Sequence, residues 1–300
     1  MATGNSAAGS SKRDRREEAR ETARRMREEA AKKARRRRFI VQGSIIAAVI
    51  AILAIVAVVI FSSVEGSTEA ANPKNMLSGG ILLTSPDHAV TTPAIASGKK
   101  ATPTTQKLDG KTAHIQIWLD YQCPICDDFE KTNESTIKSM LAAGTATLEI
   151  HPVAILDNAN NNKYSTRAAA AAACVANDDP DKFLAINTVL FDNQPDETTG
   201  SGLSNSTMLQ LFKSVGVSSS AVTDCVNQQT FAGFVTNQTN SVVENSQLSN
   251  PQIGGFGTPA VFVNGERYNG SVLNAKQFEL FVQTAVSDAG SGGTVTFPKP

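Results

Sequence analysis

The sequence is poor in the residues from which metal sites and hydrolytic sites are usually built. Its 300 residues contain only three histidines and four cysteines. Structural zinc sites usually combine two compact ligand pairs, whereas this chain has one close pair of cysteines and no pair of histidines near it. The histidines are dispersed, at His88, His114 and His151, which argues against a cysteine–histidine hydrolase. A glycine-rich phosphate loop is also missing. We therefore expect neither a metal nor a nucleotide cofactor.

Charged residues are missing from residues 39–61, which consist mainly of Ile, Ala and Val. A helix rises about 1.5 Å per residue, so a stretch of this length is enough to cross a bilayer. Residues 1–38 contain 14 Lys and Arg against 6 Asp and Glu, and end in four arginines. The positive-inside rule then predicts a single transmembrane helix with residues 1–38 as a cytoplasmic arm and residues after 61 outside the cell. A cleaved signal peptide is the alternative, but its apolar core is normally only ~7–15 residues long.

The basic arm of residues 1–38 has two conceivable partners. Basic clusters next to a membrane helix usually bind anionic lipid headgroups, which is the partner we expect. Nucleic acid is the disfavoured alternative.

The most informative motif is Cys123-Pro124-Ile125-Cys126, which lies between a predicted buried strand at 114–120 and an amphipathic helix that continues to residue 141. The first cysteine then lies at a helix N-terminus, where unpaired N–H groups and the helix dipole favour a thiolate. The spacing lets the second cysteine close a disulfide with the first. The motif therefore predicts a dithiol that cycles by thiol–disulfide exchange.

The other two cysteines, Cys174 and Cys225, also follow the predicted membrane helix, so all four lie in a compartment where disulfides persist. Neither belongs to a closely spaced pair, which makes a catalytic role for them improbable.

The rest of the chain predicts an α/β domain at residues 111–290. Residues 62–110 are rich in Ser, Thr, Pro and Gly, and are expected to be an extracytoplasmic linker with a short hairpin near 81–90. Residues 155–250 are expected to be a helical insertion, and residues 291–300 a flexible tail. The expected strands are 146–153 and 259–263, followed by an Asn264-Gly265 turn, and the expected helices are 164–177, 181–191, 205–215, 219–228, 230–247 and 274–286, with Asp181 and Asn205 as N-caps.

At this point the chain resembles the DsbA-like thiol:disulfide oxidoreductases, which have a thioredoxin-like fold, and in particular the membrane-tethered extracytoplasmic members of Gram-positive bacteria. The resemblance covers roughly residues 105–290. It rests on the runs Leu119-Asp120-Tyr121-Gln122-Cys123-Pro124-Ile125-Cys126, His151-Pro152-Val153-Ala154-Ile155-Leu156-Asp157, Tyr164-Ser165-Thr166-Arg167-Ala168-Ala169 and Gly257-Thr258-Pro259-Ala260-Val261-Phe262-Val263-Asn264-Gly265.

The resemblance implies a role for each site residue. Cys123 would be the nucleophile that forms a mixed disulfide with a client, and Cys126 would resolve it. Pro259 would be a cis-proline facing the cysteine pair, and the main chain of Thr258 would pair with an extended client segment. The resemblance also implies a structural disulfide between Cys174 and Cys225, while two separate buried thiols remain the alternative.

The sequence departs from the family at two positions that tune the redox potential. A buried acid often precedes the nucleophile by six residues, but Ile117 is found here, and the histidine that strongly oxidising members often carry between the cysteines is replaced by Ile125. Nearby carboxylates at Asp120, Asp127, Asp128 and Glu130 are expected to raise the pKa of Cys123. The helix N-terminus must then do most of the activation. The potential is left open between the thioredoxin-like end (about −270 mV) and the DsbA-like end (about −120 mV).

The function expected from the resemblance is oxidation of cysteines in exported proteins by a membrane-anchored, extracytoplasmic enzyme. A membrane partner similar to DsbB or vitamin K epoxide reductase would re-oxidise the cysteine pair. A reductase or isomerase with the same site is the first alternative, and a non-catalytic binding or chaperone module on the same scaffold is the second.

Overall fold

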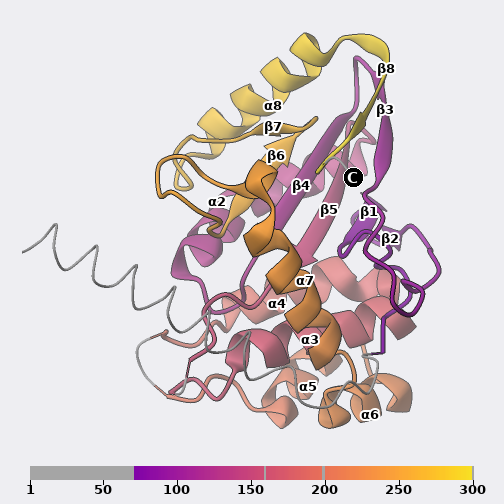
Figure 1. Ribbon diagram of the computed structural model, residues 1–300, viewed down its shortest axis with the longest axis vertical. Coiled ribbons are helices and arrows are strands. Elements are labelled where there is room, and N and C mark those ends of the chain that lie inside the picture. Colours follow the sequence, from indigo (N-terminus) through magenta and orange to yellow (C-terminus); the bar gives the residue numbers. More distant parts are fainter. Residues whose placement is uncertain (1–70, 159, 198–199, 299–300) are drawn as a thin grey trace, which may run out of the picture. The chain divides into compact units, whose positions relative to one another are not determined.

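A six-stranded sheet forms the centre of the computed structural model, which describes residues 71–158, 160–197 and 200–298 (Figure 1). The strand order is β2-β1-β5-β4-β6-β7. β4 and β5 run parallel and are joined through helix α2, whereas the other neighbouring strands pair antiparallel. The bounds are β1 Ile81–Ser85, β2 His88–Ala89, β4 Ala113–Leu119, β5 Ala146–Pro152, β6 Ala260–Val263 and β7 Glu266–Arg267.

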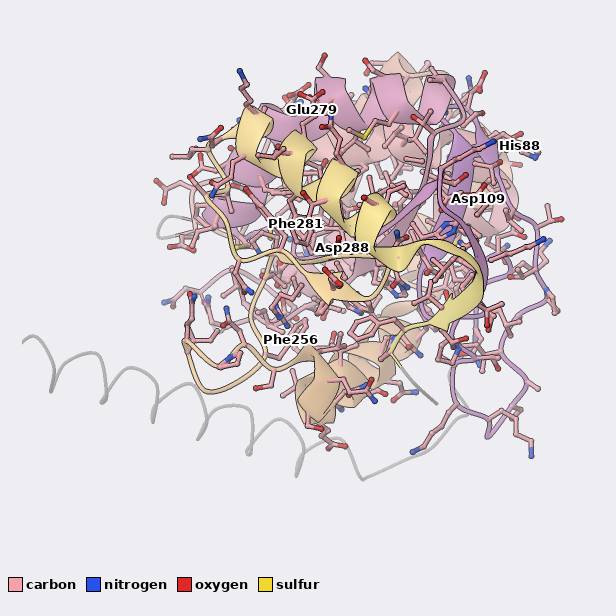
Figure 2. All side chains as sticks on the ribbon, turned by 90° about the horizontal axis from the view of Figure 1, so that it is seen from above. His88, Asp109, Phe256, Glu279, Phe281 and Asp288 are labelled. Atoms are coloured by element: carbon pink, nitrogen blue, oxygen red, sulfur yellow. A yellow bond between two sulfur atoms is a disulfide. The ribbon has the colours of Figure 1, made fainter. Side chains whose placement is uncertain are left out.

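Helices α2 (Pro124–Ala142) and α8 (Ala275–Ala289) pack against the sheet and against each other. The ring of Phe129 on α2 meets that of Phe278 on α8 edge-to-face, with 5.3 Å between centroids. On α8 the amphipathic pattern separates an exposed Glu279 from Phe281, whose ring packs 5.2 Å from that of Tyr268 (Figure 2). These contacts fix the orientation of α2, whose N-terminus carries the cysteine pair.

The predicted helical insertion is confirmed. Its helices are α3 Tyr164–Asp178, η1 Pro180–Lys182, α4 Phe183–Asp192, α5 Asn205–Ser214, α6 Ser220–Gln228, α7 Ala232–Glu244 and η2 Ser246–Leu248. Both predicted N-caps were wrong by one residue. Ser204 is the N-cap of α5, and its hydroxyl accepts a hydrogen bond from the N–H of Thr207. The N-cap of α4 is Lys182. The carboxylate of Asp181 instead accepts a hydrogen bond from the N–H of Ala89.

The predicted strand hairpin after residue 259 is also confirmed. Asn264 and Gly265 connect β6 to β7 with φ values of 52° and 84°, so both turn residues lie in the left-handed region that a type I′ turn requires. Asn264 tolerates this region better than most side chains, and glycine has no side chain to clash.

The linker expected at 62–110 was wrong for its described part, residues 71–110. The hairpin near residue 81 is present, but its strand β1 is an integral sheet member that pairs with β5. A further strand, β3 (Thr105–Asp109), follows, and residues 71–298 belong to one compact unit. The segment is held by polar contacts that composition does not reveal. Ser78 and Thr104 donate hydrogen bonds of 2.5 and 2.6 Å to the buried carboxylate of Glu149 on β5.

The flexible tail expected at 291–300 was also wrong for its described part, residues 291–298. Residues Ser291–Thr296 form β8, which pairs antiparallel with β3 in a separate two-stranded sheet. Directly after it, the carbonyl of Phe297 accepts a hydrogen bond from Gln116 on β4. The ring of Phe297 also contacts the rings of Trp118 and Phe262. Contacts of the Phe297 ring and main-chain pairing with β3 therefore hold residues 291–298 in place, although their glycine-rich composition predicted a flexible segment.

The basic arm at 1–38 and the transmembrane helix at 39–61 lie outside the described residues. Within residues 71–158, 160–197 and 200–298, no helix has the length and apolar character needed to cross a bilayer.

Candidate active site

The two cysteines of the Cys-x-x-Cys motif lie where β4 passes into α2. Cys123 is the N-cap of α2 in an extended conformation, and Pro124 takes the first helical position, where its missing N–H costs no hydrogen bond. The N–H groups of Cys126 and Asp127 donate to the carbonyl of Cys123. Cys123 is 6% exposed and Cys126 fully buried, and the two thiols are free. Of the two cysteines, only Cys123 therefore keeps any exposed surface.

The two thiols differ strongly in acidity. A hydrogen bond from the Cys126 thiol is the main factor that lowers the pKa of Cys123 to about 7, although burial opposes it and the side chain of Thr258 assists it. Burial raises the pKa of Cys126 well above its usual value, and the hydrogen bond to Cys123 adds to this. The sequence predicted that the helix N-terminus would do most of the activation, but the neighbouring thiol contributes most. The thiol of Cys123 is thus the more acidic of the two, and Cys126 keeps its proton at neutral pH.

The peptide bond between Thr258 and Pro259 is cis, as the family resemblance implied. It precedes β6, which pairs with β4 through Ala260 opposite Trp118, and this pairing brings the 258–259 bond to the cysteines. The Cys123 sulfur lies 3.5 Å from the carbonyl oxygen of Thr258. Thr258, Pro259 and Cys123 are therefore brought together from segments 135 positions apart in sequence.

The carboxylates near the motif have different environments. Asp120 is fully buried, and burial raises its pKa to about 6 although the N–H groups of Gln122 and Leu156 donate to it. Asp127 is instead paired with Lys131 at 2.8 Å, and Asp128 is exposed. Of the three, only Asp120 has a resolved effect on Cys123, whose pKa it raises as expected from like charge. Asp120 ends the stretch that the sequence predicted as a buried strand, and its side chain is buried.

A second buried acid, Glu130, lies one turn further along α2. Burial raises its pKa to about 8, and its carboxylate accepts a hydrogen bond from Asn187 of α4 at 3.3 Å. Asn187 also accepts from the hydroxyl of Tyr121 at 3.0 Å. The sequence gave no signal for this network, because it joins the motif to the helical insertion.

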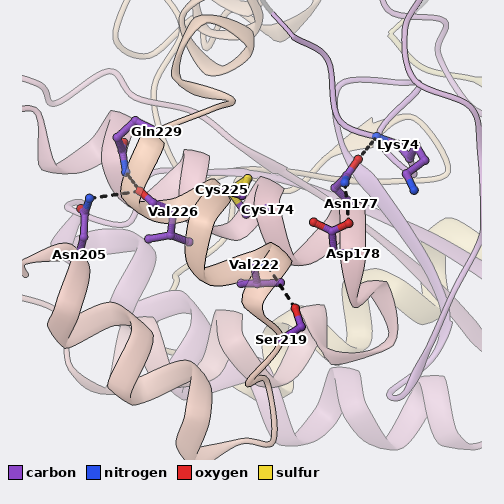
Figure 3. The surroundings of a disulfide bond; sticks show 10 residues. All are labelled: Lys74, Cys174, Asn177, Asp178, Asn205, Ser219, Val222, Cys225, Val226 and Gln229. Atoms are coloured by element: carbon purple, nitrogen blue, oxygen red, sulfur yellow. Dashed lines mark hydrogen bonds between the residues drawn. A yellow bond between two sulfur atoms is a disulfide. The ribbon is translucent and has the colours of Figure 1, made fainter.

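Cys174 and Cys225 form a disulfide between α3 and α6, with the Cα atoms 5.8 Å apart (Figure 3). The confirmed pairing agrees with the family resemblance. Around it, Val226 accepts hydrogen bonds from Asn205 and Gln229, and Ser219 caps α6 through the N–H of Val222. The bond joins two helices across 51 positions of the chain, so it is a structural crosslink of the insertion.

The described residues contain no group of three or more His, Cys, Asp and Glu side chains arranged to hold a metal ion. A cavity of about 460 Å³ lies between the sheet and α7, where Trp118, His151 and Val242 contribute to its lining. Neither cysteine of the motif lines this cavity, so it is separate from the site described above.

A family model described as Thioredoxin matches residues 109–283 of this chain. Among solved structures, DsbA from Mycobacterium tuberculosis is 28% identical, with a TM-score of 0.50, and the match covers 70% of this chain and 99% of that one. MdbA, a thiol-disulfide oxidoreductase from Corynebacterium diphtheriae, also has a TM-score of 0.50, with 69% of this chain and 93% of that one covered. At 17% identity, this second likeness shows the fold alone.

A curated relative, the serine/threonine-protein kinase PknE of Mycobacterium tuberculosis, is 29% identical over 174 residues. This match covers 52% of the chain but only 29% of the kinase's own length. The chain belongs to the thioredoxin family, and its fold and Cys-x-x-Cys site are those of the DsbA-like thiol-disulfide oxidoreductases.

Proposed function

We propose that the protein oxidises cysteines of exported proteins from the outer face of a membrane, with Cys123 and Cys126 as its redox-active disulfide. The observation that carries this proposal is the asymmetry of the pair. The thiol of lowered pKa is the accessible one, and its partner is fully buried with a raised pKa. A thiolate that is stable at neutral pH is a good leaving group, so Cys123 readily leaves the mixed disulfide when a second client thiolate attacks the client sulfur.

The reaction transfers two electrons from the client to the pair. A client thiolate attacks the sulfur of Cys123, the Cys123–Cys126 bond breaks, and Cys126 leaves and takes up a proton. A second client thiolate then attacks the client sulfur of the mixed disulfide and releases Cys123 as a thiolate. The client gains one disulfide, and the pair is left reduced. The reduced pair would be re-oxidised by a membrane partner of the DsbB or vitamin K epoxide reductase type, which would take the two electrons. The enzyme would then need no further cofactor.

The client would bind beside the carbonyl of Thr258 and the ring of Pro259. Two large apolar side chains near the site are exposed: Ile125, between the cysteines, at 52% and Ile253, in the loop before Thr258, at 59%. Main-chain pairing with Thr258 and apolar contacts with these isoleucines would accept an extended segment with little sequence preference.

The first test is to trap the mixed disulfide. In the Cys126→Ala variant the resolving thiol is missing, so client proteins should remain covalently attached to Cys123 and be released by reductant. The Cys123→Ala variant is the matched control and should trap nothing. If the Cys126→Ala variant forms no adducts with reduced, unfolded client proteins, the protein is a non-catalytic binding or chaperone module.

A second candidate, a reductase or isomerase with the same site, is favoured by one observation. The pKa of Cys123 is about 7, which is similar to that of thioredoxin (about 7) and well above that of DsbA (about 3.5). Equilibration of the pair with glutathione decides between the two. A potential near −120 mV supports the oxidase, whereas one near −270 mV assigns the protein to the reductases.

The membrane location rests on the sequence, through the uncharged residues 39–61 and the arginines that precede them. Full-length protein should fractionate with membranes and resist extraction by alkaline carbonate. A thiol reagent that cannot cross membranes should label Cys123 in intact cells. Recovery of the protein in the soluble fraction would contradict the anchor. If the anchor is correct, residues 1–38 should also bind vesicles that contain anionic lipid more tightly than neutral ones.

A further inference from the structure

The active-site turn has no cap of its own. Cys123 occupies the N-cap position of α2, but its side chain makes no capping hydrogen bond. Ser, Thr, Asp and Asn are preferred at this position because their side chains satisfy the free N–H groups of the first turn. Cysteine is not among these residues, and hydrogen bonds from another segment help to hold the main chain of this turn.

The holding group comes from the helical insertion. The side-chain amide of Gln194, just after α4, donates to the carbonyl of Cys123 at 2.9 Å and to that of Tyr121 at 3.2 Å. In the opposite direction, the buried side chain of Gln122 donates to the carbonyl of Pro195 at 3.2 Å. Three hydrogen bonds thus join two segments that are about 70 positions apart in sequence.

The segment that provides Gln194 is itself anchored. The main-chain N–H of Gln194 donates to the carbonyl of Phe191 at the end of α4. The ring of Phe191 packs 5.2 Å from the ring of Tyr121. The hydroxyl of Tyr121 reaches Asn187 on the same helix. Tyr121 is therefore held by α4 through its side chain and by Gln194 through its main chain.

We propose that Gln194 is a positioning residue of the thiol–disulfide site, through which the insertion holds the main chain of the active-site turn and adjusts the reactivity of Cys123. The proposal rests on the proposed function for its biological meaning. The carboxamide places the positive end of its N–H dipole against the carbonyl of the residue that bears the thiolate. Loss of this donor removes a favourable electrostatic contact with the thiolate form and loosens the turn that orients the two sulfurs.

The test compares three variants of the reduced protein. Gln194→Ala removes the side-chain amide, and Gln194→Met removes the donor but keeps a chain of similar length. Asn193→Ala is the matched control, because Asn193 lies on the same segment and its amide donates to Val189 on the exposed side of α4. The pKa of Cys123 is measured from thiolate absorbance at 240 nm against pH, and the potential from equilibration with glutathione.

Both Gln194 variants should raise the pKa of Cys123 by about 0.3 to 0.5 pH unit, less than the loss of a hydrogen bond to the sulfur itself, and should make the potential more negative. Asn193→Ala should leave both unchanged. Folded Gln194 variants with unchanged pKa and potential overturn the proposal, as does an equal shift in Asn193→Ala. If both Gln194 variants lose their fold, or melt earlier with no pKa shift, the role of Gln194 is structural only.

These measurements need no client, so they separate this proposal from the proposed function. A pKa shift without client adducts in the Cys126→Ala variant supports the positioning role and contradicts the oxidoreductase function. Client adducts in the Cys126→Ala variant, together with an unchanged pKa of Cys123 in the Gln194 variants, support the oxidoreductase function and contradict the positioning role.

Discussion

The two cysteine pairs show how placement decides the chemistry of the same side chain. Cys123 and Cys126 are separated by two residues at the start of one helix, and one of them has a lowered pKa. Cys174 and Cys225 lie 51 positions apart on two helices and are joined in a disulfide among buried side chains. The first pair is placed to exchange electrons with another molecule, and the second to hold the insertion together. Spacing along one helix and local electrostatics, rather than cysteine content, separate the two roles.

The largest effect should come from removing the nucleophile. Cys123→Ser should abolish the oxidation of a reduced client protein, because a serine hydroxyl cannot form a disulfide. Cys174→Ser/Cys225→Ser should retain this activity under conditions where it is folded. Oxidative refolding of a reduced, disulfide-containing protein measures both variants. If the Cys123→Ser variant remained active, the distinction between the two pairs would be lost.

The structural pair should dominate stability instead. Cys174→Ala/Cys225→Ala should lower the free energy of unfolding by about 2–5 kcal/mol. Removal of the disulfide increases the conformational entropy of the unfolded chain, in which the long loop is no longer closed. Urea unfolding monitored by circular dichroism measures the change. Cys123→Ala/Cys126→Ala is the matched control and should change the stability far less than the loss of the crosslink does.

The reactivity of the reduced motif should depend on pH around neutrality. The thiolate is the reactive form and the pKa of Cys123 is about 7, so alkylation by iodoacetamide should fall roughly tenfold per pH unit below 7 and level off above it. Burial raises the pKa of Cys126, which should react far more slowly across this range. Mass spectrometry of the alkylated peptides distinguishes the two cysteines. A midpoint near 9 would contradict the assigned environment of Cys123.

The smallest effect should come from the buried acid behind the motif. Asp120→Asn removes a negative charge that raises the pKa of Cys123, so this pKa should fall by about 0.3 unit or more. Asp128→Asn, which removes an exposed charge from the second turn of α2, is the control and should leave the pKa within error. A rise in the Cys123 pKa in Asp120→Asn would show that the carboxylate acts through hydrogen bonds rather than charge.

The sequence predicted the part of the fold whose side chains follow a clear period. The buried strand before Cys123, α2 and the insertion helices were found because apolar residues recur at strand or helix spacing. The Cys123–Cys126 pair was identified from its spacing at a helix N-terminus, whereas Thr258, Pro259 and the Cys174–Cys225 pairing were identified through the family resemblance. The helices and strands were found from short periodic stretches of sequence, and the site residues from motifs that follow one another along the chain in the same order as in the family.

The missed elements depend on contacts between distant polar residues. β1 and β3 are held partly by Ser78 and Thr104, which donate to Glu149, and no pattern in residues 71–110 points to that carboxylate. The same carboxylate accepts from Gln116 at 2.7 Å, and burial at this point is tolerated because several donors surround the charge. Gln194 was missed for the same reason, since its partners are main-chain carbonyls of another segment.

The pairing of β3 with β8 also sets an order of events during synthesis. Thr105 and Thr296, which face each other in this ribbon, are separated by 191 positions. At about 5–20 residues per second, the ribosome adds the second strand roughly 10–40 s after the first. Throughout that interval the hydrogen-bonding edge of β3 has no β8 to pair with, and the amide of Gln116 lacks the carbonyl of Phe297. The ribbon is therefore among the last parts of the domain to close, well after the cysteines of the motif have been made.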